Sequence, residues 1–237
     1  MSLYNLEKPN YKFDKIEFKT DHILNKRIKP PFPNQSFFMC IIGKARSGKT
    51  TFLINMLTNK NIYRKVFDKI FLAAPKSSRK SLKNDIFEDL PEEQKFYEIS
   101  PELFNIIHET GEELIDDEGK RPKQQLLIID DLAVQLREYE YELKQLMFNR
   151  RHIRLSVIIL SQTLRSIPQA LRFQTSQLIF FKSSNNLELD IIRDEYIMME
   201  KKKFINFVNF VFDAKYNFMF IDKDDEIYYK NFQKIIL

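Results

Sequence analysis

The eight residues from Gly43 to Thr50 restrict the fold of this chain more than any other segment. They read Gly-Lys-Ala-Arg-Ser-Gly-Lys-Thr, which fits the phosphate-loop spacing G-x-x-x-x-G-K-[ST] without deviation. The apolar run Ser36 to Ile42 precedes them, and a helical pattern follows from Thr50 to Leu57. A buried strand that turns sharply into a helix lets successive backbone N–H groups converge on a phosphate. The sequence therefore predicts a phosphate-binding loop between a strand and a helix.

Glycine usage supports this interpretation. The chain of 237 residues contains four glycines, whereas about 17 would be expected at an average frequency of roughly 7%. Two of the four, Gly43 and Gly48, lie in the loop. Lys49 is expected to reach the β- and γ-phosphates of ATP, and the Thr50 hydroxyl to hold Mg²⁺. The predicted nucleotide-binding residues are Gly43, Lys44, Ala45, Arg46, Ser47, Gly48, Lys49, Thr50 and Thr51.

A second apolar strand ends in two carboxylates. Leu126 to Ile129 is followed directly by Asp130 and Asp131. At the carboxyl edge of a parallel sheet this pair is expected to lie beside the phosphate loop. Asp130 would hold Mg²⁺, and Asp131 would orient and polarise the attacking water. The two motifs together predict ATP hydrolysis.

Strand and helix patterns alternate along the rest of the chain. Such alternation predicts an α/β fold with a three-layer αβα architecture and a mainly parallel sheet. We expect a RecA/ASCE-like P-loop NTPase domain at 36–237, with an N-terminal arm at 1–35 that carries short strands near 11–18. The further expected strands are Lys69–Ala73, Lys95–Ile99, Leu155–Leu160 and Gln177–Phe181, with a C-terminal β-hairpin of Phe218–Ile221 and Ile227–Phe232. The expected helices are Ser100–Leu114, Val134–Arg151, Leu187–Lys201 and Phe204–Ala214.

The class of P-loop protein is narrowed by spacing and by missing motifs. About 80 residues separate Lys49 from Asp130, and they contain the extra strand Lys69–Ala73, as in RecA-like and AAA-like ATPases. No guanine-reading Asn-Lys-x-Asp segment occurs, which argues against a GTPase. No Leu-Ser-Gly-Gly-Gln segment occurs, which argues against a transporter-type ATPase.

Polar residues follow the strand at Leu155–Leu160. Gln162 is the candidate sensor of the γ-phosphate, and Ser161 is the alternative. Arg165 and Arg172 come next, in a segment that could face a central channel or form an ordinary exposed loop.

Three arginines precede the same strand, in Asn-Arg-Arg-His-Ile-Arg at 149–154. The guanidinium fork suits a transferring phosphoryl group. Arg151, with Arg150 as the alternative, is the candidate arginine finger that acts in trans within a ring. The other interpretation is a basic helix C-terminus that interacts favourably with the helix dipole.

Composition bounds the surroundings and partners of the chain. A single cysteine, Cys40, excludes an internal disulfide and fits a reducing compartment. No stretch reaches 18 apolar residues, so no membrane span is expected. The formal net charge of +5 permits a nucleic-acid partner without requiring one.

These motifs together resemble the poxvirus-type genome-packaging ATPases of large cytoplasmic DNA viruses and their virophages, within the FtsK–HerA superfamily. The resemblance covers about residues 36 to 232. It rests on the phosphate loop, on Leu-Leu-Ile-Ile-Asp-Asp-Leu at 126–132, on the run from Asn149 to Thr163 and on Ile-Pro-Gln-Ala-Leu-Arg at 167–172. Many superfamily members have Glu as the second acid, whereas this chain has Asp131.

The resemblance implies an ATP-driven translocase that threads double-stranded DNA into a preformed capsid as a homo-oligomeric ring, a pentamer or a hexamer. It implies that Lys49 and Thr50 bind nucleotide and Mg²⁺, that Asp130 and Asp131 form the acidic pair, that Gln162 is the sensor and that Arg151 is the finger. Capsid vertex proteins are a further expected partner, and the host cytoplasm (the viral factory) or the virion is the expected location. Two other functions stay open at this point: a DNA helicase or helicase loader, and a nucleotide-binding switch that barely hydrolyses ATP.

Overall fold

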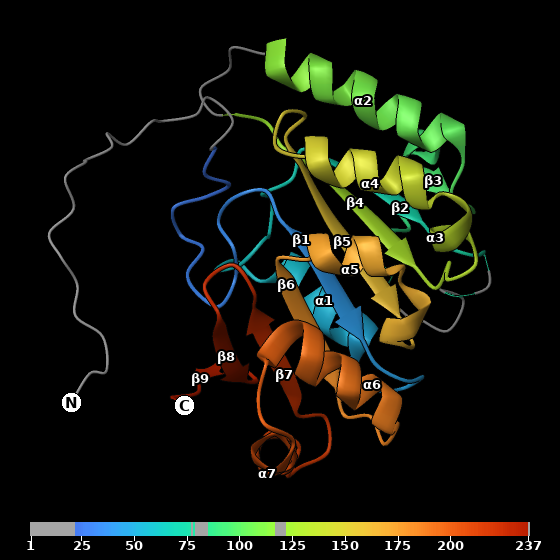
Figure 1. Ribbon diagram of the computed structural model, residues 1–237. Coiled ribbons are helices and arrows are strands. Elements are labelled where there is room, and N and C mark those ends of the chain that lie inside the picture. The colour runs from blue at the N-terminus through green and yellow to red at the C-terminus, as the bar shows by residue number, and fades with distance from the viewer. Residues whose placement is uncertain (1–21, 77, 79–84, 117–121, 237) are drawn as a thin grey trace, which may run out of the picture.

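The computed structural model describes residues 22–76, 78, 85–116 and 122–236 (Figure 1). The strands expected near residues 11–18 lie outside these ranges. In the described part of the chain, one sheet of nine strands runs through the molecule in the order β3-β2-β4-β5-β1-β6-β7-β8-β9. The strands are β1 (Phe38–Ile42), β2 (Lys69–Ala73), β3 (Lys95–Phe96), β4 (Gln125–Asp130), β5 (Leu155–Ser161), β6 (Gln177–Phe181), β7 (Phe218–Asp222), β8 (Ile227–Lys230) and β9 (Gln233–Lys234).

The sheet is mainly parallel. Six strands pair in parallel, in the sheet order β3, β2, β4, β5, β1 and β6. The three C-terminal strands β7, β8 and β9 add to β6 in antiparallel pairs. Every residue of β1, β4, β5 and β6 is buried, as expected of central strands covered on both faces. The predicted α/β architecture is confirmed.

Helices and irregular segments cover the two faces of the sheet (Figure 1). In β1, Phe38, Cys40 and Ile42 join an apolar cluster with the longer helices, whereas Met39 and Ile41 join a cluster with α1 on the opposite face. This alternation is the period of two of a strand. The helices are α1 (Lys49–Thr58), α2 (Pro101–Asp116), α3 (Gln135–Glu138), α4 (Glu140–Asn149), α5 (Gln169–Gln174), α6 (Asn186–Ile191) and α7 (Lys201–Val211), and a π-helical turn η3 (Ile192–Ile197) continues α6.

The helix expected over Val134–Arg151 is wrong as a single element. It is divided into α3 and α4 at Tyr139, whose φ of −105° and ψ of 29° leave the helical region. The Tyr139 ring packs against Phe104 of α2, with ring centroids 5.9 Å apart. The division thus coincides with a tertiary contact that the helical pattern does not encode.

The helix expected over Leu187–Lys201 also ends early. The π-helical turn η3 ends at Ile197, and the next residue, Met198, adopts a left-handed conformation with a φ of 51°. The expected strand Lys95–Ile99 contains only the two residues of β3. The second hairpin strand ends at Lys230, because Asn231 turns with a φ of 57° and the chain adds β9.

The described residues before β1 form no helix or strand, yet they pack on the core. Leu24, Ile28 and Phe32 are buried in the same cluster as α1. Residues 22–35 therefore belong to the packed body of the molecule.

Candidate functional site

The ends of β1, β4 and β5 bring the predicted motifs to one edge of the sheet. In the parallel register Ile42 lies beside Ser161, and Asp130 lies beside Leu160. The Gly43 N–H donates to the Ser161 carbonyl at 3.1 Å, and the Asp131 N–H donates to the Leu160 carbonyl at 3.2 Å. The phosphate loop and the acidic pair thus lie on either side of β5, at its carboxyl end.

The extra strand predicted from spacing, β2, does not separate the two motifs in space. It pairs with the outer side of β4, and β5 is the strand between β4 and β1. This order leaves the tip of β5 in contact with both motifs.

The loop needs glycine at two positions for different reasons. Gly48 has a φ of 112°, in the left-handed region that side chains disfavour. A Cβ at Gly43 would lie 2.5 Å from Ser47 Oγ and 2.8 Å from Phe181 Cβ. The two glycines therefore shape a tight cradle that any larger residue would fill.

Lys49 lies across the mouth of this cradle. Its Nζ donates to the Gly43 carbonyl at 2.6 Å and to the Lys44 carbonyl at 3.4 Å. Burial lowers the pKa of Lys49, and the charges of Asp131 and Asp130 act against that shift. The ammonium group is therefore within electrostatic reach of both acids, where a phosphate would take over its hydrogen bonds.

The two acids differ in their surroundings. Asp130 is 8% exposed, whereas Asp131 is exposed and turns with a φ of 59°. Gln162 Nε2 lies 3.1 Å from Asp131 Oδ2 and 3.4 Å from Oδ1. Ser161 is buried and its hydroxyl pairs with Ser166 Oγ at 2.6 Å. Of the two sensor candidates, Gln162 is the one that faces the acidic pair.

The donor groups fit ATP and Mg²⁺. Ser47 Oγ is buried among the described atoms without a hydrogen-bond partner, and it belongs to the cradle. The described residues contain no group of three or more His, Cys, Asp or Glu side chains that could hold a metal alone. Mg²⁺ typically takes one or two carboxylates together with substrate phosphates, which Thr50 and Asp130 could share with a nucleotide.

The three arginines lie at the other edge of the sheet, before β5 begins at Leu155. The seven residues of β5 span about 20 Å, so Arg151 and the loop are not brought together within one chain. Arg150 donates to the Met147 carbonyl at 2.8 Å, and burial, followed by the charge of Arg151, lowers its pKa. Arg154 donates to the Leu114 carbonyl, whereas Arg151 is exposed.

The channel-facing position considered for Arg172 is wrong. Arg172 is 8% exposed and lies in α5. Its guanidinium donates to both carboxylate oxygens of Glu195, at 2.8 and 2.7 Å, and to the Ile167 carbonyl at 2.7 Å. Arg172 therefore connects the segment that follows β5 with η3, and its charge is paired with Glu195 and not presented to a channel.

A buried carboxylate that the sequence analysis did not identify holds the same segment. Glu188 is 2% exposed and accepts the N–H groups of Leu164 at 2.6 Å and Arg165 at 3.3 Å. It therefore fixes the turn that follows Gln162. A glutamate at the start of a helical pattern carries no local sign of this role, because its partners lie 23 and 24 residues away.

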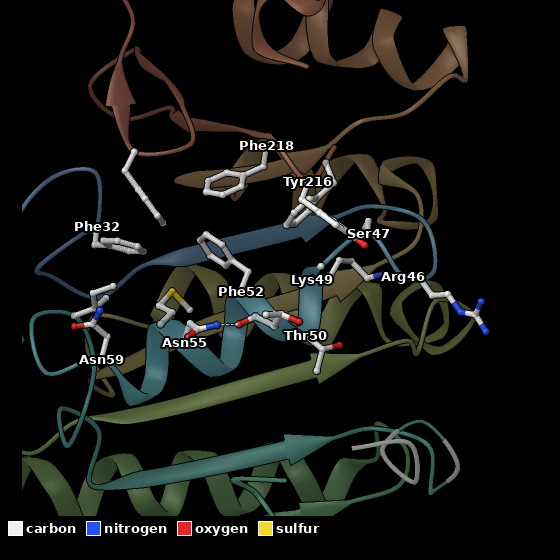
Figure 2. A pocket seen from close by; sticks show the side chains of 16 residues that line it. Phe32, Arg46, Ser47, Lys49, Thr50, Phe52, Asn55, Asn59, Tyr216 and Phe218 are labelled. Carbon is white, nitrogen blue, oxygen red and sulfur yellow. Dashed lines mark hydrogen bonds between the residues drawn. The ribbon is translucent and has the colours of Figure 1, made fainter. Parts of the chain in front are cut away.

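A cavity of about 730 Å³ adjoins the loop along α1 (Figure 2). Its lining combines loop residues with aromatic rings from several parts of the chain. The aromatic members are Phe32, Phe52, Phe181, Tyr216, Phe218 and Phe232.

Comparison with known proteins gives one family and a set of similar folds. The family model described as Poxvirus A32 protein matches residues 28–236. No curated protein sequence matches the chain. Among the helices of the described residues, none is long and apolar enough to cross a membrane.

The similar structures include two virus proteins. The genome packaging NTPase B204 of Sulfolobus turreted icosahedral virus 2, in complex with AMP, has a TM-score of 0.58 at 15% identity, and the match covers 85% of this chain and 98% of that one. B204 of Sulfolobus turreted icosahedral virus, described as a DNA-packaging ATPase, has a TM-score of 0.58 at 16% identity, covering 83% and 97%. EssC (ATPases 2 and 3) of Geobacillus thermodenitrificans has a TM-score of 0.55 at 11% identity, covering 84% and 39%. At these identities the likeness establishes the fold.

Proposed function

Because this chain belongs to the poxvirus A32 protein family, we propose that it is an ATPase that drives double-stranded DNA into a viral capsid. The observation that carries the proposal is the meeting of the phosphate loop, Asp130, Asp131 and Gln162 at one sheet edge. Similar folds belong to proteins described as a genome packaging NTPase and a DNA-packaging ATPase. The site has the parts that hydrolysis needs, and the family supplies the context for its use.

Each site residue takes one role in this proposal. The backbone N–H groups of the loop and Lys49 bind the phosphates of ATP, and Thr50 and Asp130 hold Mg²⁺, which neutralises charge on the phosphate oxygens. Asp131 orients the attacking water and accepts its proton. Gln162, which already donates to Asp131, senses the γ-phosphate.

Arg151 acts on a neighbouring subunit. It is exposed and lies at the sheet edge opposite its own loop, so a head-to-tail neighbour could receive it. Head-to-tail contacts generate a closed ring when the rotation closes. We therefore propose a homo-oligomeric ring, a pentamer or a hexamer, with the DNA in its central channel. The ring would bind at a capsid vertex, in the host cytoplasm or the virion.

The experiment is an ATPase assay with and without duplex DNA, alongside a strand-separation assay. We expect ATP hydrolysis that needs Mg²⁺ and that duplex DNA stimulates. The rate should drop by at least about 100-fold in Asp131→Asn, since an acid–base group contributes about 10²–10⁴-fold. Strand separation, or full turnover of Asp131→Asn, would overturn the proposal.

The trans role of Arg151 has a separate test. Lys49→Ala and Arg151→Ala should each abolish hydrolysis. Mixed oligomers should recover part of it, because an intact nucleotide site can then meet an intact arginine. Inactivity of every mixture would refute the shared site but leave the ATPase itself in place.

A further inference from the structure

The aromatic cavity is continuous with the phosphate loop. Residues 46–51 line one end of it, and the rest is lined by α1 and the residues just after it, by Phe32, by Phe181 and by the C-terminal segment (Figure 2). Phe181, at the end of β6, lies under the loop, with its Cε1 3.3 Å from the Cβ that a side chain at Gly48 would carry. A molecule whose phosphates occupy the loop therefore has this cavity as the adjoining space for its remaining atoms.

The inner wall of the cavity is made of packed rings. Phe52 of α1 and Phe218 of β7 meet edge to face, with centroids 5.1 Å apart and an interplanar angle of 78°. Phe232 contacts Phe218 with a centroid separation of 5.3 Å. Phe52 and Phe218 are 9% and 8% exposed, whereas Phe232 is 51% exposed. The wall is thus rigid inside and accessible at its rim.

Tyr216 stands at the loop end of this rim. It is 59% exposed and lines the same cavity as Ser47 and Phe218 (Figure 2). Its φ of 69° is in the left-handed region, which bulky residues seldom adopt unless neighbouring structure holds them there. Asn217 supplies such support, because its amide donates to Asp213 Oδ1 at 2.7 Å and accepts from Asn231 at 3.0 Å.

We propose that Tyr216 stacks on the base of the bound nucleotide and holds it against the wall formed by Phe52 and Phe218. This inference rests on the proposed binding of triphosphate at the loop. Every base has a π-face, and stacking on an aromatic side chain does not depend on which base is bound. Asn55 of α1 lines the cavity as well; its Nδ2 donates to the Thr51 carbonyl at 2.8 Å, so its side-chain oxygen is the group offered to the polar edge of the base. Tyr216 is therefore an affinity residue for nucleosides and makes no contact with the reacting phosphate.

The test compares two probes that share their phosphates and differ in the base. A non-hydrolysable ATP analogue and inorganic tripolyphosphate, each with Mg²⁺, are titrated into wild type, Tyr216→Ala and Tyr216→Phe. Tyr216→Ala should bind the ATP analogue about tenfold more weakly, a difference of about 1.4 kcal/mol, and should bind tripolyphosphate unchanged. Tyr216→Phe should bind both as wild type does. A GTP analogue should lose the same factor as the ATP analogue.

Phe210→Ala is the matched control. Phe210 is 54% exposed on α7, and Lys230 Nζ lies 4.7 Å from its ring centroid, as Lys215 Nζ lies 4.8 Å from that of Tyr216. It is not among the residues that line the cavity, so its removal should leave both affinities unchanged.

The possible outcomes distinguish a failure of the Tyr216 stacking role from a failure of nucleotide binding at the phosphate loop. Equal weakening of both probes, or no change in either, overturns the stacking role of Tyr216. Equal affinity of wild type for the ATP analogue and tripolyphosphate overturns the base site but leaves the phosphate loop in place. Failure of wild type to bind either probe refutes the proposed function, and the inference with it.

Discussion

Glu188 should support the sensor position from a distance. Its carboxylate, buried in α6, accepts the N–H groups of Leu164 and Arg165, directly after the Gln162 that contacts Asp131. Glu188→Ala removes both acceptors and leaves the N–H of Leu164, a fully buried residue, without a partner. We expect a loss of stability together with a loss of turnover.

The size of the stability loss follows from the geometry. A hydrogen bond to a charged group contributes about 1.5–3 kcal/mol. The bond to Leu164 is short, at 2.6 Å, and that to Arg165 is long, at 3.3 Å, so we expect about 3 kcal/mol in total. For a domain of this size, 1 kcal/mol moves the melting temperature by about 2–4 °C, which gives a decrease of about 6–12 °C. Glu188→Gln should lie between the two proteins, because its amide keeps one acceptor and turns a donor toward the other N–H group.

Thermal unfolding and steady-state ATP hydrolysis measure the two effects. Glu195→Ala is the matched control, because it also removes a carboxylate of the α6–η3 unit, a partly buried one that pairs with Arg172, farther from Gln162. Both variants should melt earlier. At a temperature where both are folded, kcat should fall further in Glu188→Ala, with little change in the KM for ATP. An equal effect on kcat in the two variants, or wild-type stability in Glu188→Ala, would refute the reasoning.

Three further predictions follow from single contacts. Gly43→Ala should cost about 1–3 kcal/mol of stability through overpacking and should abolish nucleotide binding. Gly111→Ala is its control: the new Cβ would lie 2.6 Å from Ile153 Cβ, so it should cost as much stability but keep nucleotide binding. Calorimetry measures stability and binding in both variants, and retained binding in Gly43→Ala would contradict the role of the cradle. Burial raises the pKa of the Cys40 thiol to about 12, so it should stay protonated and resist alkylation at pH 8 until the protein is unfolded; labelling of the native protein at the unfolded rate would contradict this. Arg172→Met should lower the unfolding free energy by about 2–3 kcal/mol, because it leaves the partly buried Glu195 carboxylate unpaired. The double variant with Glu195→Met should recover most of that loss in urea titrations, and additive losses would exclude the pair.

The parts of the fold that the sequence predicted correctly depend on short, contiguous patterns. β1, β4 and β6 are built on apolar runs, and every residue of these strands is buried, as is typical of central strands covered on both faces. The phosphate loop is recognised just as locally, because its glycines lie within eight residues, although Phe181 of β6 adds to the crowding at Gly43. The meeting of loop and acids then required one further rule, that parallel strands end at a common edge.

The features that the sequence did not reveal depend on partners far along the chain. Tyr139, at which the predicted helix is divided, packs against Phe104, 35 residues earlier. Arg172 looked like an exposed loop residue, because its partner Glu195 lies 23 residues later in a different element. The aromatic cavity joins rings from the N-terminal segment, α1 and the C-terminal strands. Side-chain pairing across elements is set by the packing of the whole sheet, and no local period encodes it.

The tip of β5 is where these local and distant contacts meet. Gln162 contacts Asp131 on one side, and the turn after Gln162 is held by Glu188 on the other. Farther along the same segment, Arg172 ties α5 to Glu195 in η3. A displacement of Gln162 would therefore have to break hydrogen bonds to α6 or carry α6 and η3 with it. Breaking buried, charge-assisted bonds costs several kcal/mol, and moving α5 and α6 would disturb β6, which lies between them in the chain and pairs with β1 and β7, so both responses are costly. The contacts of α6 and η3 thus hold the turn after Gln162, and with it the position of Gln162 beside Asp131.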